Sequence, residues 1–411
     1  DGLLANSKLK WETTISRNFG IDFGLLNNRV NGSLEVYWNT TKDLLMAVPV
    51  DNTTGYSYQF QNFGKTSNRG IELSVNVDVI NKGDFRFNVG AIYNYNRNKL
   101  DELPNADQYL YSSYWGSSSL VPTNDYMFVE GKAIGLVRGF ISEGYYTVDD
   151  FNYTNGQYVL KEGVPDITKA LTATYMHPYD LPAGQTAFPG AAKFRDVDES
   201  GTVDLDDATC LGEVMPRHTG SFQLNFNYKN FDLSTNFNWT AGGKVYNVAA
   251  MINASGQEFD GIGAQRASWV ADAFKVYNVN AAGDLYAVTN PDELRALNAN
   301  AKYHLPYHQS GITSSEWLEN GSYLRLQTLT LGYTLPKNWL TKVHVDKIRL
   351  YLTATNLFTI TGYSGIDPEV NANPTGQSGF YSDLRIFPTL NMDFGTYPRA
   401  RTFTFGANIT F

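Results

Sequence analysis

Apolar and polar residues alternate without a break in the final stretch of the chain, RTFTFGANITF. Phe403, Phe405, Ala407 and Ile409 fall on one face of an extended strand, and the residues between them are small and uncharged. Because successive side chains of a β-strand point to opposite faces, this period of two predicts a strand with one apolar and one polar face. A polar face without charges is typical of the wall of a water-filled lumen.

The same period recurs along the chain and predicts about ten strands of roughly ten residues, a length that crosses a bilayer at a tilt. The clearest runs are residues 15–25, 30–38, 71–79, 85–96, 222–228, 231–239, 322–335, 348–354 and 402–411. Two features depart from strict alternation. Arg17 lies on an otherwise apolar face, which is costly at mid-depth in a bilayer but tolerable near its interface. In SYLRLQTLTLGYTL the apolar phase changes, which predicts a β-bulge near Gln327–Thr328.

The connections between these runs alternate in length. Short turns are expected near 27–29, 81–84 and 229–230, with a modest one at 335–344, and long segments near 39–67, 98–218, 240–321 and 359–400. Short turns on one side and long loops on the other predict an all-β fold, an antiparallel transmembrane β-barrel with extracellular loops. The alternative is a soluble β-sandwich or repeat array, but sandwich strands are usually shorter and such long loops are uncommon.

Composition and charge narrow the class further. The 411 residues carry a formal net charge of −9, which argues against nucleic acid as a partner. No stretch approaches the roughly 18 apolar residues of a membrane-spanning helix, whereas a β-barrel hides its apolar residues at every second position. The single cysteine, Cys210, allows no internal disulfide. The chain opens with DGLLANSKLKW, without a leader, so we expect a processed protein or a piece of a longer polypeptide.

The most specific candidate site is the stretch Asp196–Asp207, DVDESGTVDLDD, which matches the spacing of an EF-hand calcium loop. The expected ligands are Asp196, Asp198, Ser200, Thr202 through its carbonyl, Asp204 and Asp207. Gly201 stands at the sharp turn, but the last position is Asp rather than Glu and no amphipathic helix precedes the loop. A solvated acidic turn without metal is therefore the alternative. We expect structural Ca²⁺, because the loop falls in the long extracellular segment 98–218, where weak sites stay filled.

A dense aromatic cluster, YLYSSYWGSSS at 109–119, lies in the same long segment. Its candidate substrate-binding residues are Tyr109, Tyr111, Tyr114 and Trp115. Exposed aromatic faces stack on sugar rings and also serve as anchors at protein interfaces. Packing of the loop on itself, or contact with a partner protein, is the alternative.

The sequence offers no support for catalysis. It contains no G-x-S-x-G, H-E-x-x-H, P-loop or Rossmann glycine motif. We therefore expect no catalytic residues and no enzymatic activity.

Several stretches resemble the SusC/RagA-type TonB-dependent outer-membrane transporters. They are LKWETTISRNFGIDFGLLNNRVNGSLEVYWNTTKDLL, NFGKTSNRGIELSVNV, YLRLQTLTLGYTLP, LYLTATNLFTITGYSGIDPEVN and YPRARTFTFGANITF. The resemblance covers nearly the whole chain, and the separate motifs follow one another in the same order.

This resemblance implies more than the spacing does. Such proteins are large barrels with an N-terminal plug, and they lie in the outer membrane of Bacteroidetes-type bacteria. They pair with a SusD-like surface lipoprotein and import oligosaccharides or oligopeptides, driven by TonB. Residues 1–411 would then form about 10–12 C-terminal strands of a 22-stranded-type barrel, with the plug and the TonB-contacting segment outside this chain.

Three functions follow as hypotheses. The first is a segment of a transporter, which supplies barrel wall and loops. The second is a surface adhesin or binding protein with a calcium-stabilised loop, and the third is an outer-membrane hydrolase with its active site at the barrel rim. The choice between glycan and peptide as substrate stays open.

Overall fold

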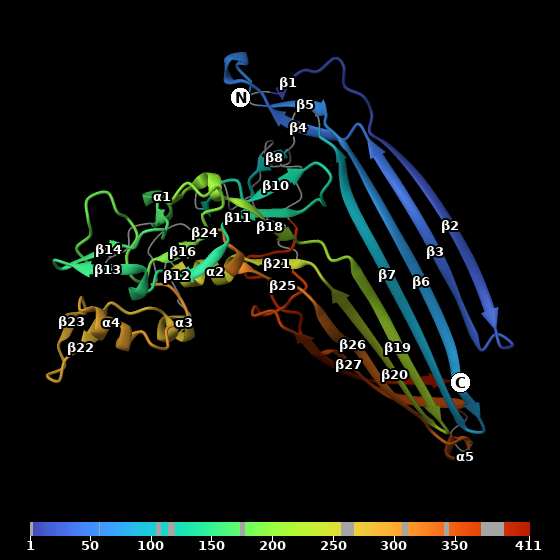
Figure 1. Cartoon of the computed structure of the whole chain (residues 1–411). Coiled ribbons are helices and arrows are strands. Elements are labelled where there is room, and N and C mark those ends of the chain that lie inside the picture. Colours follow the sequence, from blue (N-terminus) through green and yellow to red (C-terminus); the bar gives the residue numbers. More distant parts are fainter. Residues whose placement is uncertain are drawn as a thin grey trace.

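The computed structural model describes residues 3–56, 58–103, 108–113, 120–172, 177–255, 267–305, 311–340, 345–370 and 390–411. Its main feature is one antiparallel sheet, curved into an open wall (Figure 1). The nine strands, in their order across the sheet, are β2 (Thr13–Leu25), β3 (Val30–Lys42), β6 (Lys65–Lys82), β7 (Phe85–Glu102), β19 (His218–Tyr228), β20 (Phe231–Ala241), β26 (Tyr323–Thr334), β27 (Lys347–Thr361) and β29 (Thr402–Thr410). Each strand therefore pairs with its neighbours in sequence among the long strands.

Every run of alternating residues in the sequence became one of these strands. The count is nine rather than about ten, and most of the strands are longer than expected, up to 18 residues in β6, although β29 has 9. The extra length lies mostly at the loop ends, where apolar residues no longer alternate cleanly and the sequence pattern fades.

The strand register aligns the apolar residues into rows across the sheet. One row consists of Ile21, Leu34, Leu73, Tyr93, Gly220, Trp239, Leu324 and Ile360. Directly opposite residues point to the same side of a sheet, so these rows form one continuous apolar face. That face is open to its surroundings, as the exposures of 61% at Phe19 and 74% at Phe405 show. A large exposed apolar face on a sheet is what contact with lipid requires.

The opposite face is polar and hydrogen-bonded across strands. One of its rows consists of Asp78, Asn88, Asn225, Ser234, Thr330, Thr353 and Thr404. The Thr330 and Thr353 hydroxyls lie 2.9 Å apart, and the Arg349 guanidinium donates to both carboxylate oxygens of Asp232 at 2.9 and 2.5 Å. This face has the character of a water-filled lumen.

The predicted β-bulge is confirmed. Asn236 pairs with Thr328 and Phe237 with Leu326, so Gln327 is an extra residue in the ladder between β20 and β26. Its side-chain carbonyl accepts a hydrogen bond from the Asn238 amide at 2.5 Å. The bulge explains why the apolar residues of β26 change phase without changing face.

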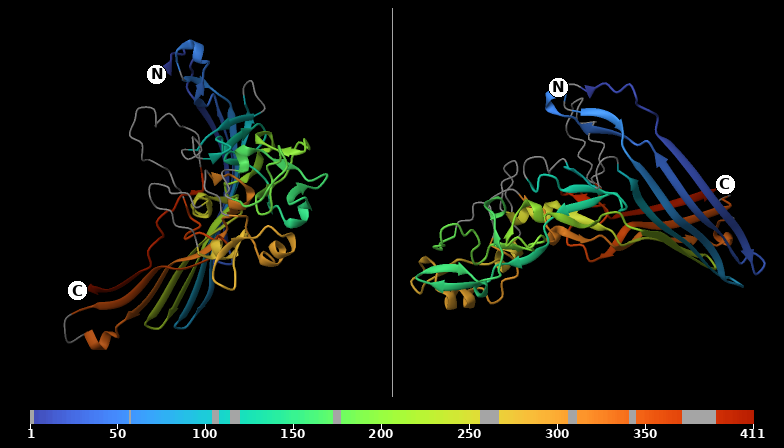
Figure 2. Two further views of the ribbon diagram at one scale, coloured as in Figure 1. Left: turned by 90° about the vertical axis from the view of Figure 1, so that its left-hand side faces the viewer. Right: turned by 45° about the horizontal axis from the view of Figure 1, so that its top comes forward.

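All short connections lie at one end of the sheet and all long ones at the other, as the alternating lengths predicted (Figures 1 and 2). Asn27 and Asn28 take positive φ in the turn between β2 and β3, a conformation that Asn tolerates. The turn between β26 and β27 contains α5 (Lys337–Leu340). None of the helices in the described part of the chain is long and apolar enough to cross a membrane.

The long connections fold into a region of short strands and helices, which we call the cap. Its elements are β4 (Leu45–Pro49), β5 (Tyr58–Asn62), β8 (Gln108–Tyr111), β9 (Leu120–Val121), β10 (Tyr126–Val129), β11 (Leu136–Gly139), β12 (Ser142–Tyr145), β13 (Phe151–Thr154), β14 (Gln157–Leu160), β15 (Asp166–Ile167), α1 (Lys169–Thr172), β16 (Ala192–Phe194), β17 (Thr202–Val203), β18 (Thr209–Glu213), β21 (Lys244–Asn247), α2 (Val248–Ser255), α3 (Ala267–Asp272), β22 (Tyr277–Val279), β23 (Leu285–Ala287), α4 (Pro291–Leu297), β24 (Gly311–Ile312), β25 (Leu318–Asn320) and β28 (Met392–Asp393), with β1 (Leu3–Leu4) paired to β5. Two large hydrophobic clusters hold it together, one around Phe140 and Phe188 and one around Tyr126 and Met251. Among the described residues, the nine-stranded sheet contributes only Leu100, Leu326 and Ala354 to the buried apolar set.

The two faces of the sheet should respond differently to the same charge. We expect Val75→Arg, in the middle of the apolar face, to lower the free energy of unfolding in lipid vesicles by about 2–4 kcal/mol, because an arginine near the bilayer midplane is desolvated. Asn76→Arg, the next residue on the polar face, should cost less than half as much. Guanidinium titration of tryptophan fluorescence in the full-length protein measures both, and equal costs would contradict the assignment of the faces.

Candidate functional site

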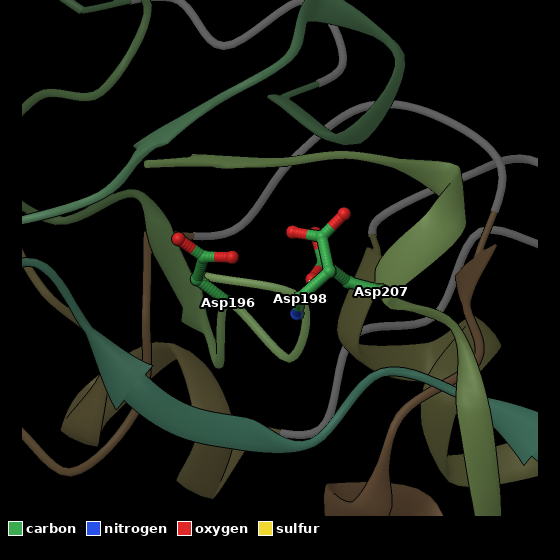
Figure 3. A group of neighbouring side chains, drawn as sticks. All are labelled: Asp196, Asp198 and Asp207. Carbon is green, nitrogen blue, oxygen red and sulfur yellow. The ribbon is translucent and has the colours of Figure 1, made fainter. Parts of the chain in front are cut away.

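The acidic stretch predicted as a calcium loop folds so that three of its carboxylates converge. Oxygen atoms of Asp196, Asp198 and Asp207 all lie within 4.8 Å of one another (Figure 3). Among the described residues, none of the three makes an ion pair, although carboxylates this close repel one another. The loop therefore concentrates negative charge that no cationic side chain among the described residues neutralises.

Backbone amides hold this geometry. Asp196 accepts hydrogen bonds from the N–H groups of Ser200 at 3.1 Å and Gly201 at 2.7 Å. Asp207 is fully buried and accepts from Val197 at 2.6 Å and Asp204 at 2.8 Å. Gly201 has a φ of +86°, so the glycine at the sharp turn is required by the backbone.

The loop is anchored to the cap through its apolar residue. Val203 is fully buried in the cluster around Phe140 and Phe188, and its strand β17 pairs in parallel with β15. The N–H of Thr168 donates to the carbonyl of Val203 at 3.0 Å. The loop is therefore attached to the packed core of the cap.

The remaining predicted ligands divide into two groups. The Ser200 hydroxyl donates to the Thr202 carbonyl at 3.0 Å, which places the oxygens of the fifth and seventh positions next to each other. The Ser200 hydroxyl and N–H also hold the pKa of Asp198 below its usual value. Asp204 is not among the converging carboxylates; it accepts from the Asp206 N–H at 2.8 Å and caps the following 3-10 turn.

The aromatic cluster is placed only in part. Tyr111 is 4% exposed and stacks on Phe128 with a centroid distance of 4.7 Å, so the expectation that it is exposed is wrong. Tyr109 is partly buried and meets Phe63 edge-on at 5.6 Å. Tyr114 and Trp115 lie outside the described residues. Tyr111 is buried because β8 pairs with β10 and turns alternate side chains inward, a short strand that the apparently irregular loop sequence did not reveal.

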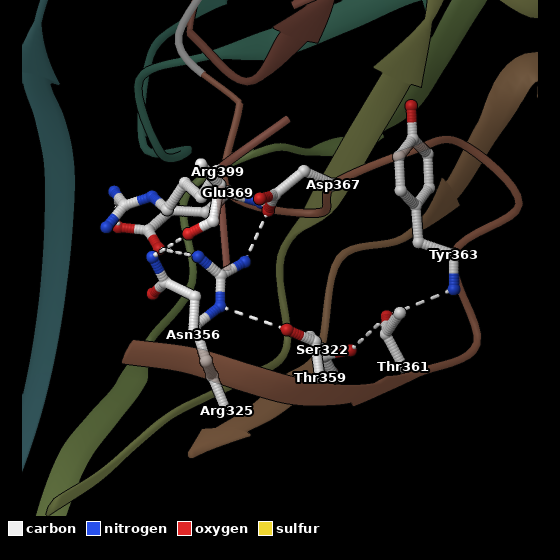
Figure 4. Close-up of polar contacts among 10 residues, drawn as sticks. Ser322, Arg325, Asn356, Thr359, Thr361, Tyr363, Asp367, Glu369 and Arg399 are labelled. Atoms are coloured by element: carbon white, nitrogen blue, oxygen red, sulfur yellow. Dashed lines mark hydrogen bonds and ion pairs between the residues drawn. The ribbon is translucent and has the colours of Figure 1, made fainter. Parts of the chain in front are cut away.

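One ionic network at the rim of the sheet was not predicted (Figure 4). Arg325 of β26 points from the polar face and lies 2.5 Å from Asp367 and 3.2 Å from Glu369, residues of the last long connection. Its Nε donates to the Thr359 hydroxyl at 3.1 Å, and Arg399 lies 2.6 Å from the other side of Glu369. The side chains of Arg325 and Asp367 are nearly inaccessible, so this network fastens the last connection over the lumenal face.

Three further buried titratable groups belong to the cap. Burial raises the pKa of Asp125 to about 6, although the Ser113 N–H and hydroxyl donate to its carboxylate at 2.7 and 2.5 Å. Burial also lowers the pKa of His304 to about 4 and raises that of Glu316, 4.0 Å away, to about 7. None of the three lies with the converging carboxylates.

The lipid-facing wall, the polar inner face and the loops folded at one end define an outer-membrane β-barrel protein. The chain belongs to the family described as TonB dependent receptor-like, beta-barrel, whose family model matches residues 1–357. The resemblance seen in the sequence is thereby confirmed, as is the outer-membrane location.

Individual relatives agree with this assignment. The TonB-dependent receptor P3 of Formosa agariphila is 30% identical over 99% of this chain, and the TonB-dependent receptor SusC of Bacteroides thetaiotaomicron is 26% identical over 99%. The chain spans 35% and 32% of the length of these two relatives. The structure of the RagAB peptide transporter matches 99% of the chain with a TM-score of 0.66 at 22% identity, which shows a shared fold. These relatives carry the names of receptors and a transporter, not of enzymes.

The rim network provides a test of how the last connection is fastened. We expect Arg325→Met to open the segment 362–370, because the removal of one partner of a buried ion pair costs about 3–5 kcal/mol. Hydrogen exchange with mass spectrometry should show faster exchange in that segment. Arg399→Met, which breaks a pair whose side chains are 45% and 39% exposed, is the matched control and should change exchange little. Equal protection in both variants would show that Arg325 does not fasten the segment.

Proposed function

We propose that this chain forms part of the wall and the extracellular cap of a TonB-dependent transporter that imports oligosaccharides or oligopeptides. The observation that carries the proposal is the placement of all four long connections at one end of the sheet, where they fold into a cap with its own core. A cap of this kind offers a surface that can hold a large solute above a polar lumen. Membership of the TonB-dependent receptor family supports the same function.

The wall needs further strands from the rest of the protein. In the described sheet, β2 and β29 each pair with one strand only. Unpaired backbone groups are not tolerated in contact with lipid, so a membrane sheet of this kind must close into a barrel. We infer that other parts of the transporter supply the remaining strands and the plug. This inference agrees with the comparison, in which the chain spans about a third of the length of its relatives.

The mechanism divides between this chain and its partners. A SusD-like surface lipoprotein would deliver the solute to the cap, and TonB would act on a plug outside this chain. The rim network around Arg325 would keep the last connection in place while the plug moves. Of the predicted substrate contacts, Tyr109, Tyr114 and Trp115 stay candidates, whereas Tyr111 is buried within the cap.

We also propose that the acidic loop binds Ca²⁺ and that the ion fixes the cap. Ca²⁺ prefers six to eight oxygen ligands, and Asp196, Asp198 and Asp207 already bring carboxylate oxygens together. Ser200 and the Thr202 carbonyl would complete the set, with Asp204 contributing through water. The ion would neutralise the converging charges, and its effect would pass to the core through Val203.

Transport can be tested in cells of the source organism. We expect deletion of the full-length gene, and separately of TonB, to abolish growth on the imported oligosaccharide or peptide mixture as sole carbon source, because import by this family is energised through TonB. Binding of fluorescent solute to the cell surface should persist without TonB. Uptake that is unchanged in the TonB deletion would favour the adhesin, and cleavage of the solute by purified protein would favour a hydrolase.

Calcium binding can be tested by calorimetry on the full-length protein. We expect one calcium site that is lost in Asp198→Ala, because that substitution removes a converging carboxylate. Asp206→Ala removes an exposed acidic group outside the converging set and should leave binding unchanged. If the unmodified protein shows no heat of binding at millimolar calcium, the acidic loop is not a calcium site.

A further inference from the structure

A group of basic residues interrupts the apolar face near the cap. Arg17, Arg69, Arg97 and Lys99 come from strands β2, β6 and β7, and we call them the outer-face basic cluster. The register pairs Arg17 with Trp38, Trp38 with Arg69, and Arg69 with Arg97, while Lys99 pairs with Ser67 in the next row. Because paired residues point to the same side, all of these side chains share one face.

That face is the lipid-facing one. The neighbouring row towards the short turns consists of Phe19, Val36, Ile71 and Tyr95, which continue the apolar surface of the wall. Arg17, Arg69 and Arg97 are exposed, so their guanidinium groups are free to reach a ligand in the membrane.

The protein does not neutralise most of this charge. Lys99 lies 3.3 Å from Asp101, but in the part of the chain that the structure describes, Arg17, Arg69 and Arg97 have no ion-pair partner. Arg69 and Arg97 stand directly opposite each other on adjacent strands, where like charges destabilise a sheet. An anion between the two side chains would relieve this repulsion.

The height of the cluster matches a membrane interface. From Phe85 at the turn end of β7 to Arg97, a tilted strand rises roughly 30 Å, at about 3.4 Å per residue and a tilt of about 40°. The apolar band of such barrels is about 25 Å tall and is bordered by aromatic residues, here Trp38 and Tyr95. The arginines therefore lie at the level of the lipid headgroups in the outward leaflet.

The surface between these side chains is hollowed. A depression of about 420 Å³ is lined by Ser67, Arg69, Tyr95, Arg97 and Lys99. Two guanidinium groups, an ammonium group and two hydroxyl-bearing residues around one hollow suit a phosphate, because a guanidinium binds phosphate through two parallel N–H donors.

We propose that the outer-face basic cluster binds the phosphate groups of an anionic lipid in the outward leaflet of the membrane. The charge of the cluster and its continuity with the lipid-facing surface select a lipid over a soluble ligand. The phosphate neutralises the facing arginines, and the acyl chains lie along the apolar face below them. This lipid site depends on the membrane location of the wall and is independent of the transported solute.

Native mass spectrometry of the detergent-solubilised full-length protein, titrated with diphosphorylated lipid A, tests the site. We expect Arg69→Gln/Arg97→Gln to weaken binding about thirtyfold, equivalent to about 2 kcal/mol at roughly 1 kcal/mol for each basic residue at a membrane surface. Arg69→Lys/Arg97→Lys retains the charges and should retain most of the binding. Lys82→Gln/Arg86→Gln removes the same charge from the turn ends of the same two strands and should change binding less than twofold.

Two further measurements distinguish binding of the phosphate from binding of the rest of the lipid. Dephosphorylated lipid A should bind weakly to the unmodified protein, and it should bind equally weakly to all variants. Without lipid, the Gln variant should be at least as stable to heat as the unmodified protein, because a like-charge contact has been removed. Equal losses of lipid binding in the two Gln variants, or no loss in either, would overturn the lipid site. So would unchanged lipid binding in a variant that no longer binds an acidic partner protein.

Discussion

Every peptide group that lies inside a bilayer must be hydrogen-bonded within the protein, and the rest of this structure depends on that constraint. Nine antiparallel strands meet it where they pair with one another, and only the outer edges of β2 and β29 require further strands. Pairing fixes the register, and the register fixes which side chains face lipid. Ile21, Leu73 and Trp239 lie in one apolar row because the register of the strands between them places all three on the same side of the sheet.

The same constraint explains why the hydrophobic core does not lie in the sheet. A barrel wall uses its apolar residues to face lipid, so they cannot also bury one another. The described apolar core lies instead in the cap, around Phe140 and Phe188 and around Tyr126 and Met251. The sheet and the cap are therefore stabilised by different environments, and links such as Arg325 to Asp367 join them.

The division between the sheet and the cap explains which features could be predicted from the sequence. Strand positions, turn positions and the bulge at Gln327 were predictable, because a period of two and its phase are local properties. The converging carboxylates of the acidic loop were predictable for the same reason, since they lie within one loop from Asp196 to Asp207. The burial of Tyr111 and the pairing of Arg325 with Asp367, 42 residues away, depend on how the connections fold in space. No local pattern encodes such contacts.

Two buried carboxylates at different places in the chain show how this protein compensates charge. Asp367 lies against Arg325 and needs no ion from outside. Asp207 is fully buried too, but it meets only backbone N–H groups and the neighbouring Asp196 and Asp198. Amide dipoles offset part of one negative charge and cannot offset three. Among the residues that the structure describes, no cationic side chain pairs with these three carboxylates, and this contrast with Asp367 is the physical basis for proposing an ion from the medium.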